Sequence, residues 1–319
     1  MKQIFTYGNY LKDKFGCKVY KVGINISGFT CPNIDGTVAK GGCTFCENDS
    51  FSASTNEIQD LKGFHLNLDS KENPFLEKQL LQLEQQFHAI SKRQADEYKA
   101  EKFLVYFQSF TNTYAPFETL KALYDKALSF DNVVGLSIGT RSDSITDETL
   151  EYLKELNKDK EIWIEFGIQS VYDKTLEKIN RGHDSDNVKE WILKSKAHGL
   201  HVCGHLIFGL PGESREMMLE TSKQAYSWGI DSVKYHPLYV VKRTALANEF
   251  SRGEFTPITE EEYLDVLVAS IKMKPQSVNV QRVTAGIDDD SLLAPSWCRN
   301  KNIQIKNINA ALKEIGLKY

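Results

Sequence analysis

The sequence has no hydrophobic run close to the roughly 18 residues that a membrane-spanning helix needs. Its first residues also lack the apolar segment of a secretion signal, so we expect a cytoplasmic protein without membrane contact. Internal repeats and low-complexity tracts are absent as well. Apolar residues make up 41% of the chain and charged residues 26%, as in soluble globular proteins. These proportions exclude a disordered or collagen-like chain.

The chain also has no large excess of positive or negative charge, since the formal net charge of the 319 residues is only −4. The basic residues gather at the ends, where residues 1–21 and 297–319 each carry a net +4. Basic ends on an acidic body can form a phosphate-binding surface. They can also be the solvated lysines that are usual at chain termini, and on charge alone we favour this second interpretation.

Cysteine is scarce, with six in the chain, but three of them are clustered. Cys31, Cys43 and Cys46 form a C-x11-C-x2-C pattern in a loop of residues 28–56 that is rich in Gly, Ser and Asn. In a reducing compartment, clustered thiols indicate a metal or redox site. A structural zinc site normally takes four protein ligands, and the loop offers no fourth. A four-iron cluster on three cysteines would leave one iron open to another ligand.

The remaining three cysteines are scattered, and we interpret them as small buried hydrophobic residues. They are Cys17, Cys203 and Cys298.

Short β-rich runs alternate with longer stretches of helical periodicity. Strands are expected at residues 22–26, 103–107, 133–138, 162–166, 201–208 and 232–236. Helices are expected from Pro74, at 117–130, after an N-cap at Ser144 or Thr146, at 172–179, at 186–199 and from about Glu213. Six strand-then-helix units in a row predict an α/β fold with a parallel sheet and right-handed crossovers. The units are too few for a complete eight-stranded barrel, so we expect a partial (β/α)6 TIM-like barrel over residues 1–240.

The pattern changes after residue 240. Residues 241–319 contain two helical stretches, 260–273 and 303–316, and one short strand candidate at 278–283. We expect a C-terminal extension that packs on the barrel and is not an independent domain.

Several segments in this order resemble the radical S-adenosylmethionine (SAM) enzymes of the YhcC/YtqA type. This family is related to the elongator catalytic subunit and to oxygen-independent coproporphyrinogen oxidase. The resemblance covers nearly the whole chain. It is carried by residues 28–37, 41–46, 107–114, 139–143, 165–170, 180–183, 205–213 and 234–238.

The resemblance implies a [4Fe–4S] cluster on Cys31, Cys43 and Cys46, with SAM bound to the open iron. Reduction of the cluster would cleave SAM to methionine and a 5′-deoxyadenosyl radical, which takes a hydrogen atom from the substrate. It also implies a low-potential electron donor, a flavodoxin or a ferredoxin.

The resemblance further implies a SAM site at the carboxyl ends of the predicted strands, where barrel active sites lie. The corresponding residues are Phe45, Gln108, Thr111, Asn112, Arg141, Asp143, Gln169, Arg181, His205 and Gly209. An arginine such as Arg181 suits the SAM carboxylate because its planar fork donates two parallel hydrogen bonds. Two positions depart from the family pattern: the usual Gly-Gly-Glu is replaced near Gln108, and His205 stands where a relative has an acid.

Candidate catalytic residues are Glu165, His205, Lys234 and His236. Glu165 has the same strand parity as Gly167 and Gln169, so all three are expected to point into the barrel. A buried structural carboxylate would explain Glu165 as well. Lys234 and His236 share one face of a strand, where they either line the substrate cavity or cap the barrel.

We expect the substrate to be RNA. The resemblance implies modification of a tRNA wobble uridine side chain, from carboxymethylaminomethyl towards aminomethyl, with the basic ends contacting phosphates. The acidic body and the sequence pI of about 6.0 favour instead a small metabolite or a protein side chain. A non-catalytic iron–sulfur or zinc scaffold is the third possibility, but such a scaffold needs no SAM site.

Overall fold

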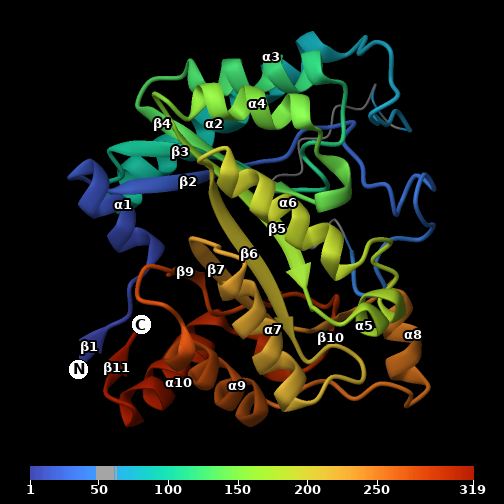
Figure 1. Cartoon of the computed structure of the whole chain (residues 1–319), viewed down its shortest axis with the longest axis vertical. Helices are drawn as coiled ribbons and strands as arrows, with labels where there is room; N and C mark the ends of the chain where they lie inside the picture. Colours follow the sequence, from blue (N-terminus) through green and yellow to red (C-terminus); the bar gives the residue numbers. More distant parts are fainter. Residues whose placement is uncertain (48–60, 62) are drawn as a thin grey trace.

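The computed structural model describes residues 1–47, 61 and 63–319, so predictions for residues 48–56 of the cysteine loop lie outside the described residues. Within the described part, seven parallel strands form one sheet in the order β2-β3-β4-β5-β6-β7-β9 (Figure 1). The strands are β2 (Val19–Ile24), β3 (Lys102–Phe107), β4 (Val133–Thr140), β5 (Glu161–Gln169), β6 (His201–Phe208), β7 (Ser232–Pro237) and β9 (Asn279–Arg282). The predicted α/β partial barrel is confirmed, with β9 as an additional seventh strand.

The sheet is strongly curled. In a flat sheet of this order, β2 and β9 would lie six strand spacings apart, roughly 29 Å. Yet Lys21 of β2 donates a hydrogen bond to Gln281 of β9 at 2.6 Å, and it also pairs with Glu165 of β5. The two edge strands therefore face each other across the interior of a half-barrel.

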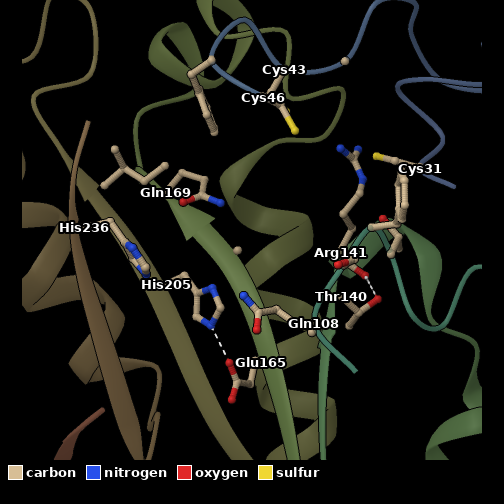
Figure 2. Close-up of a pocket in the computed structure, with 18 of the residues that line it drawn as sticks. Cys31, Cys43, Cys46, Gln108, Thr140, Arg141, Glu165, Gln169, His205 and His236 are labelled. Carbon is tan, nitrogen blue, oxygen red and sulfur yellow. Dashed lines mark hydrogen bonds and ion pairs between the residues drawn. The ribbon is translucent and has the colours of Figure 1, made fainter. Parts of the chain in front are cut away.

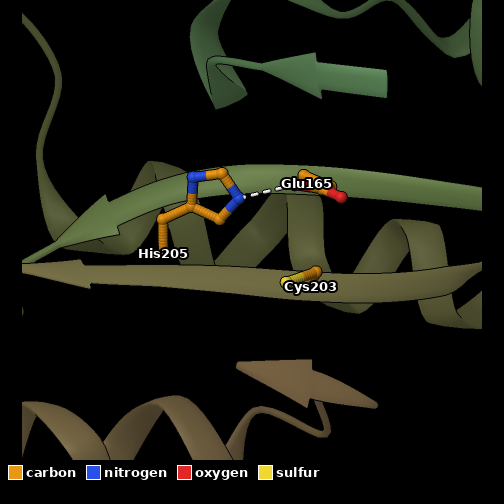
Figure 3. A group of neighbouring side chains, drawn as sticks. All are labelled: Glu165, Cys203 and His205. Atoms are coloured by element: carbon orange, nitrogen blue, oxygen red, sulfur yellow. Dashed lines mark hydrogen bonds and ion pairs between the residues drawn. The ribbon is translucent and has the colours of Figure 1, made fainter. Parts of the chain in front are cut away.

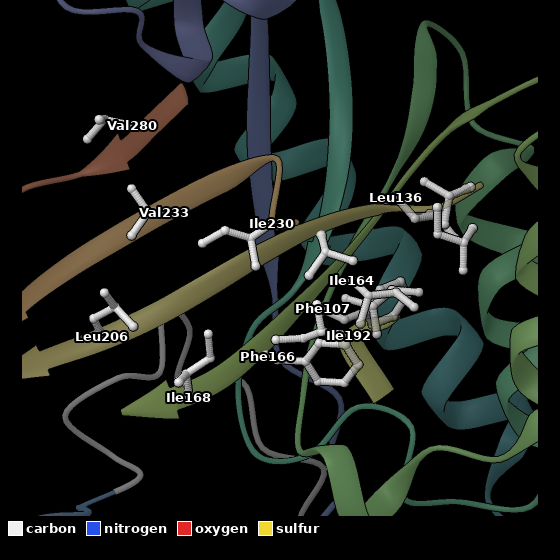
Figure 4. Close-up of a cluster of buried hydrophobic side chains, with 14 of the residues drawn as sticks. Phe107, Leu136, Ile164, Phe166, Ile168, Ile192, Leu206, Ile230, Val233 and Val280 are labelled. Atoms are coloured by element: carbon white, nitrogen blue, oxygen red, sulfur yellow. The ribbon is translucent and has the colours of Figure 1, made fainter. Parts of the chain in front are cut away.

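Alternate residues of each strand face opposite sides of this sheet. The outward residues are apolar and join one buried core with the surrounding helices (Figure 4). Phe166, Ile168 and Leu206 belong to this core, together with Ile192 from a covering helix. The covering helices are α2 (Leu76–Tyr98), α3 (Phe117–Leu128), α4 (Asp147–Leu156), α5 (Asp173–Lys178), α6 (Ser185–Ala197) and α7 (Arg215–Ser227).

Helix starts follow the local capping chemistry. Thr146 caps α4 by accepting a hydrogen bond from the backbone N–H of Thr149, whereas Ser144 lies in the 3-10 turn η3 (Ser142–Ser144). Ser214 caps α7 in the same way. Of the two N-caps expected for α4, the structure selects Thr146.

The helix α1 (Tyr7–Phe15) fills the amino end of the barrel. Its Tyr7 and Leu11 pack with Leu104, Trp163 and Cys203, which are buried on the inner face of β3, β5 and β6. The two chain ends meet beside it, because β1 (Lys2–Gln3) pairs in parallel with β11 (Leu317–Lys318). In Figure 1 both ends lie on the side away from the blue cysteine loop.

Residues after 240 both cover and extend the barrel. The helix α9 (Glu260–Met273) packs against α7, and β9 pairs with β7. The other elements of this region are β8 (Val240–Val241), α8 (Ala245–Ser251), β10 (Leu292–Ala294), η4 (Ser296–Arg299) and α10 (Lys301–Glu314). The division of the chain at residue 240 stays a prediction, and the structure adds that the barrel sheet itself continues beyond it. No helix in the described part of the chain has the length and apolar character needed to cross a membrane.

Candidate active site

One cavity opens at the carboxyl ends of the barrel strands (Figure 2). All three clustered cysteines line it, together with residues from β3, β4, β5, β6, β7 and β9. Figure 2 shows Cys43 and Cys46 at one end of the cavity and Glu165 with His205 at the other. The cavity therefore has a sulfur-lined mouth and a polar floor.

The cysteine loop is held by the segment that follows α5. Thr44 donates its backbone N–H to the Ile179 carbonyl at 3.0 Å, and the Asn180 side chain donates to the Gly42 carbonyl at 2.7 Å. Asn33 donates in return to the Asn180 and Arg181 carbonyls, at 2.5 and 2.9 Å. These bonds hold the described residues of the loop, which contain little regular secondary structure.

The thiols at the mouth suit an iron–sulfur cluster. Cys31, Cys43 and Cys46 are not joined to one another by a disulfide, and donors face the Cys43 sulfur, with Asn33 Nδ2 and Arg181 Nη1 each at 3.7 Å. Burial and then the neighbouring Cys43 raise the pKa of Cys46 to about 12, so a Cys46 thiolate at neutral pH needs a compensating positive charge such as a bound metal centre. Three sulfur ligands suit a four-iron cluster with one open iron, and hydrogen bonds to the sulfur ligands are among the factors that set its potential.

Gln169 at the end of β5 and Arg181 after α5 both line this mouth. The register between β5 and β6 shifts between Gly167 and Gln169, and Gln169 has φ +64°. A Cβ on Gly167 would lie 2.6 Å from Gln169 Nε2 and 2.8 Å from Arg181 Nη2. Glycine at position 167 thus leaves room for two predicted SAM-binding side chains, which a larger residue would push out of these positions.

Arg141 and Asp143 form a bidentate pair beside the cavity. Arg141 donates from Nε at 2.8 Å and from Nη2 at 2.5 Å to the two Asp143 oxygens. Arg141 lines the cavity, whereas Asp143 is not among the described lining residues. In the structure, Asp143 therefore orients Arg141, and its predicted direct contact with SAM stays a prediction.

The other predicted SAM residues divide into two groups. Phe45, Gln108 and Thr111 line the cavity. Asn112 and Gly209 are not among the described lining residues. The Asn112 amide donates to the Phe107 and Gly139 carbonyls and so ties the loop after β3 to β4.

Gly209 has a packing reason for being glycine. It has φ +91°, and a Cβ there would lie 2.7 Å from the side chain of Ile258. The predicted approach of Gly209 to the adenine stays a prediction.

Several polar atoms around the mouth are buried without a partner among the described residues. They are Ser109 Oγ, Arg141 Nη1, Gln169 Oε1 and Arg181 Nε. Buried polar groups are normally hydrogen-bonded, so unpaired donors and acceptors in a cavity indicate a polar ligand. An amino-acid group with both an ammonium and a carboxylate, as in SAM, matches this mixed set.

A buried charge network forms the floor. Glu165 accepts from Lys21 and from Ser137 on one oxygen, and from Lys234 and from His205 at 2.7 Å on the other. Burial alone would raise the pKa of Glu165, but Lys21, Lys234 and His205 together hold it well below its ordinary value. Glu165 is therefore an ionised carboxylate that four neighbours hold in place.

The histidines above this network are neutral. Burial, and next the nearby Lys234, lowers the pKa of His205 to about 4. Burial and then Arg282 lower the pKa of His236 well below its ordinary value. Of the four predicted catalytic candidates, Glu165, His205 and His236 line the cavity, whereas Lys234 lies behind them in contact with Glu165 and Tyr106.

Glu165, Cys203 and His205 also come together in a geometry that metal ions use (Figure 3). Both Glu165 oxygens already face lysine ammonium groups, and burial raises the pKa of Cys203 to about 12. A cation would have to displace these lysines, so the trio suits a hydrogen-bonded structural group better than a metal site. Cys298 is likewise buried, and Cys17 is half-buried.

The sequence interpretation missed four residues that shape the cavity or its floor: Lys21, Asn33, Tyr106 and Arg282. Tyr106 precedes Gln108 by two positions, so strand parity was an available signal for it. Lys21 and Arg282 lie on the two edge strands, and only the closure of the barrel brings them to the floor.

Comparisons with known proteins agree with this geometry. The model of the Radical SAM superfamily matches residues 36–225, and that of the Radical_SAM C-terminal domain matches residues 230–314. The Bacillus subtilis protein YtqA is 35% identical over 316 residues, which cover 99% of this chain and 91% of YtqA. Escherichia coli protein YhcC is 34% identical over 318 residues, covering 99% and 94%.

Similarity extends to proteins named for tRNA. The tRNA uridine(34) acetyltransferase of Methanocaldococcus infernus is 31% identical over 157 residues, 48% of this chain and 29% of that protein. Among solved structures, an N-terminally truncated Elp3 from the same archaeon has a TM-score of 0.60 at 19% identity. That match covers 94% of this chain and 64% of the archaeal one, and it shows a common fold.

Proposed function

This chain belongs to the radical SAM superfamily, and from that membership we propose that it converts the carboxymethylaminomethyl side chain of a tRNA wobble uridine towards aminomethyl. As a radical SAM enzyme it uses a [4Fe–4S] cluster and SAM. The observation that carries the RNA substrate is the 31% identity over 157 residues with a protein that acts on tRNA uridine 34. An anticodon loop is already single-stranded, so inserting its base into the cavity costs little unpairing energy.

The residues of the mouth have distinct tasks in this proposal. Cys31, Cys43 and Cys46 hold the cluster, while Arg181 and Gln169 orient SAM by its polar groups. When bound and reduced, the cluster supplies the electron that cleaves SAM to methionine and a 5′-deoxyadenosyl radical. The low-potential donor of that electron is proposed to be a flavodoxin or a ferredoxin.

The overall reaction can be written in balance with SAM as the oxidant. The carboxymethylaminomethyl group, SAM and water give the aminomethyl group as its ammonium, glyoxylate, methionine and 5′-deoxyadenosine. The hydrogen atom is taken from the methylene carbon between the nitrogen and the carboxylate. His205 and His236, which are neutral at this floor, suit the transfer of protons during hydrolysis because an unprotonated ring nitrogen can accept one.

The position of the basic chain ends limits which parts of a tRNA they can contact. Lys2 and Lys318 lie in the paired strands β1 and β11, away from the cysteine loop in Figure 1. They can contact only parts of a tRNA that lie outside the cavity. Phosphate contacts next to the modified nucleotide must come from other side chains.

Mass spectrometry of tRNA nucleosides from a strain without this gene tests the proposal. We expect loss of a modified uridine and accumulation of its carboxymethylaminomethyl precursor, both restored by the wild-type gene and not by a Cys43→Ala variant. Identical profiles in a host without a redundant enzyme would reject the RNA substrate. The search would then turn to small metabolites and protein side chains.

A further inference from the structure

The cavity carries a cation, Arg282, that no described residue neutralises. Strand register places His205 of β6 beside Lys234 of β7, and Lys234 beside Arg282 of β9. A row of three residues, His205, Lys234 and Arg282, thus crosses three neighbouring strands. Its two end residues, His205 and Arg282, line the cavity. The seventh strand thus brings a guanidinium group to the same level as the Glu165 network.

The charges of this region do not balance. Glu165 is the only carboxylate among the described lining residues, and both of its oxygens are engaged by Lys21 and Lys234. Arg141 is neutralised by Asp143, and Arg181 faces the cysteine sulfur. Arg282 has no ion pair within residues 1–47, 61 and 63–319, so its positive charge faces the cavity without a partner.

A second group beside Arg282 also lacks a partner. His236 lines the cavity, and its Nε2 is buried without a hydrogen bond to any described residue. Figure 2 shows the His236 ring directed into the cavity next to His205, and the two ring centroids are 5.8 Å apart. Leaving a buried nitrogen unpaired and a cation uncompensated is costly, and a bound anion with several acceptor oxygens relieves both costs.

We propose that Arg282 and His236 form a subsite for a carboxylate of the substrate, with Arg282 as the residue that selects carboxymethylated side chains. The guanidinium fork matches the two oxygens of a carboxylate, and a neutral imidazole adds one further donor. An uncharged or cationic side chain, such as the aminomethyl product, has nothing to neutralise Arg282. The same subsite therefore favours binding of the substrate and release of the product.

This inference deepens the proposed function and rests on it for the identity of the substrate. The first experiment compares wild type, Arg282→Gln and Arg282→Lys on tRNA that carries carboxymethylaminomethyluridine, using anaerobic enzyme with its cluster and SAM. Loss of one charge-assisted pair is expected to raise KM roughly 10- to 100-fold in Arg282→Gln, with partial recovery in Arg282→Lys. Iron content and SAM affinity should keep their wild-type values, which excludes misfolding. Arg252→Gln is the matched control, because Arg252 is an exposed arginine paired with Glu254.

A second readout measures selectivity directly. Wild type should bind carboxymethylaminomethyl-tRNA more tightly than aminomethyl-tRNA, and Arg282→Gln should bind the two equally. A variant that keeps the wild-type preference, or that loses affinity for both tRNAs by the same factor, would overturn the subsite.

A third measurement separates failure of the subsite from failure of the proposed function. If wild type does not act on the tRNA, calorimetric titration with malonate, a small dicarboxylate, tests the subsite without RNA. Malonate binding that is lost in Arg282→Gln and kept in Arg252→Gln would retain the carboxylate subsite for another substrate. Equal malonate binding by wild type and Arg282→Gln, or none by either, would reject it.

Discussion

Arg181 places one guanidinium nitrogen 3.7 Å from the sulfur of Cys43 and donates from the other to the Gly167 carbonyl at 3.0 Å. A single side chain thereby connects the cysteine loop with strand β5, which carries Gln169 and Glu165. The Asn180 and Asn33 hydrogen bonds also tie the cysteine loop to the segment after α5 that carries Arg181. The cysteine loop and the residues expected to hold SAM are therefore connected directly, through Arg181 and through side-chain hydrogen bonds to backbone carbonyls.

Replacing Arg181 should separate SAM binding from cluster assembly. In Arg181→Ala we expect SAM affinity to fall roughly 10- to 100-fold, because a charge-assisted hydrogen-bond donor is lost. Iron content should change little, since the three thiols and the Asn180 anchor remain. SAM titration of the reconstituted enzyme against its iron content measures both quantities. Equal loss of iron and of SAM affinity would show that Arg181 acts on the cluster loop instead.

Cys43 should be indispensable for the cluster and dispensable for the fold. Cys43 lines the cavity mouth and is not part of a strand or helix, so Cys43→Ala should abolish iron–sulfur absorption and SAM cleavage without unfolding the barrel. Iron analysis, deoxyadenosine production and circular dichroism test this together. Cys17→Ala, outside the described cavity lining, is the control and should retain all three properties. Deoxyadenosine production by Cys43→Ala would contradict the cluster assignment.

Gly167→Ala should damage SAM binding through steric contact alone. The added methyl would meet both Gln169 and Arg181 at less than 3 Å, so these side chains must move out of their positions. Because both contacting atoms are the ends of flexible side chains, we expect a stability loss of only about 0.5–1 kcal/mol together with weaker SAM binding, measured by denaturant unfolding and SAM titration. Gly8→Ala is the matched control, because Gly8 lies in α1 and its added Cβ meets only Thr6 at 3.9 Å. This helical substitution should not destabilise the protein.

The sequence predicts most of the fold because strand and helix signals here are local. The six β-then-α units and the helix at Glu260–Met273 follow directly from apolar spacing. The start of β2 at Val19 was not predicted, since Tyr20 and Lys21 interrupt the apolar run. The place of β9 in the barrel could not be predicted either, because it depends on which edge of the sheet a short distant strand reaches.

The site residues also divide into those that the sequence predicts and those that only the folded structure reveals. The cysteine spacing predicts a metal or redox site from residue type alone, whereas the SAM-binding role of Arg181 is implied by the family resemblance. Lys21 and Arg282 carry no such signal, because they reach the floor only when β2 and β9 curl towards each other. Strand parity therefore predicted that Glu165 points into the barrel, but not its ion pair with Lys21 or the position of Arg282 at the cavity.

The Glu165 network predicts a specific acid sensitivity. The pKa of Glu165 is held well below its ordinary value of 4.5 in the folded protein, so its contribution to stability is fully present above about pH 4.5. That contribution is lost as the pH falls through the lower, folded-state pKa.

In Glu165→Gln, Lys21 and Lys234 would face each other without their shared counter-ion, which we expect to cost about 3–5 kcal/mol at neutral pH. The variant should also lose less stability than wild type on acidification, because it has no carboxylate left to protonate there. Denaturant unfolding of the reconstituted proteins between neutral pH and about pH 3.5 measures both effects. Glu254→Gln, which removes an exposed partner of Arg252, should follow the wild-type curve. If Glu165→Gln and wild type differ by the same amount at every pH, Glu165 is not an ionised member of the network, and the cation count on which the carboxylate subsite depends would have to be revised.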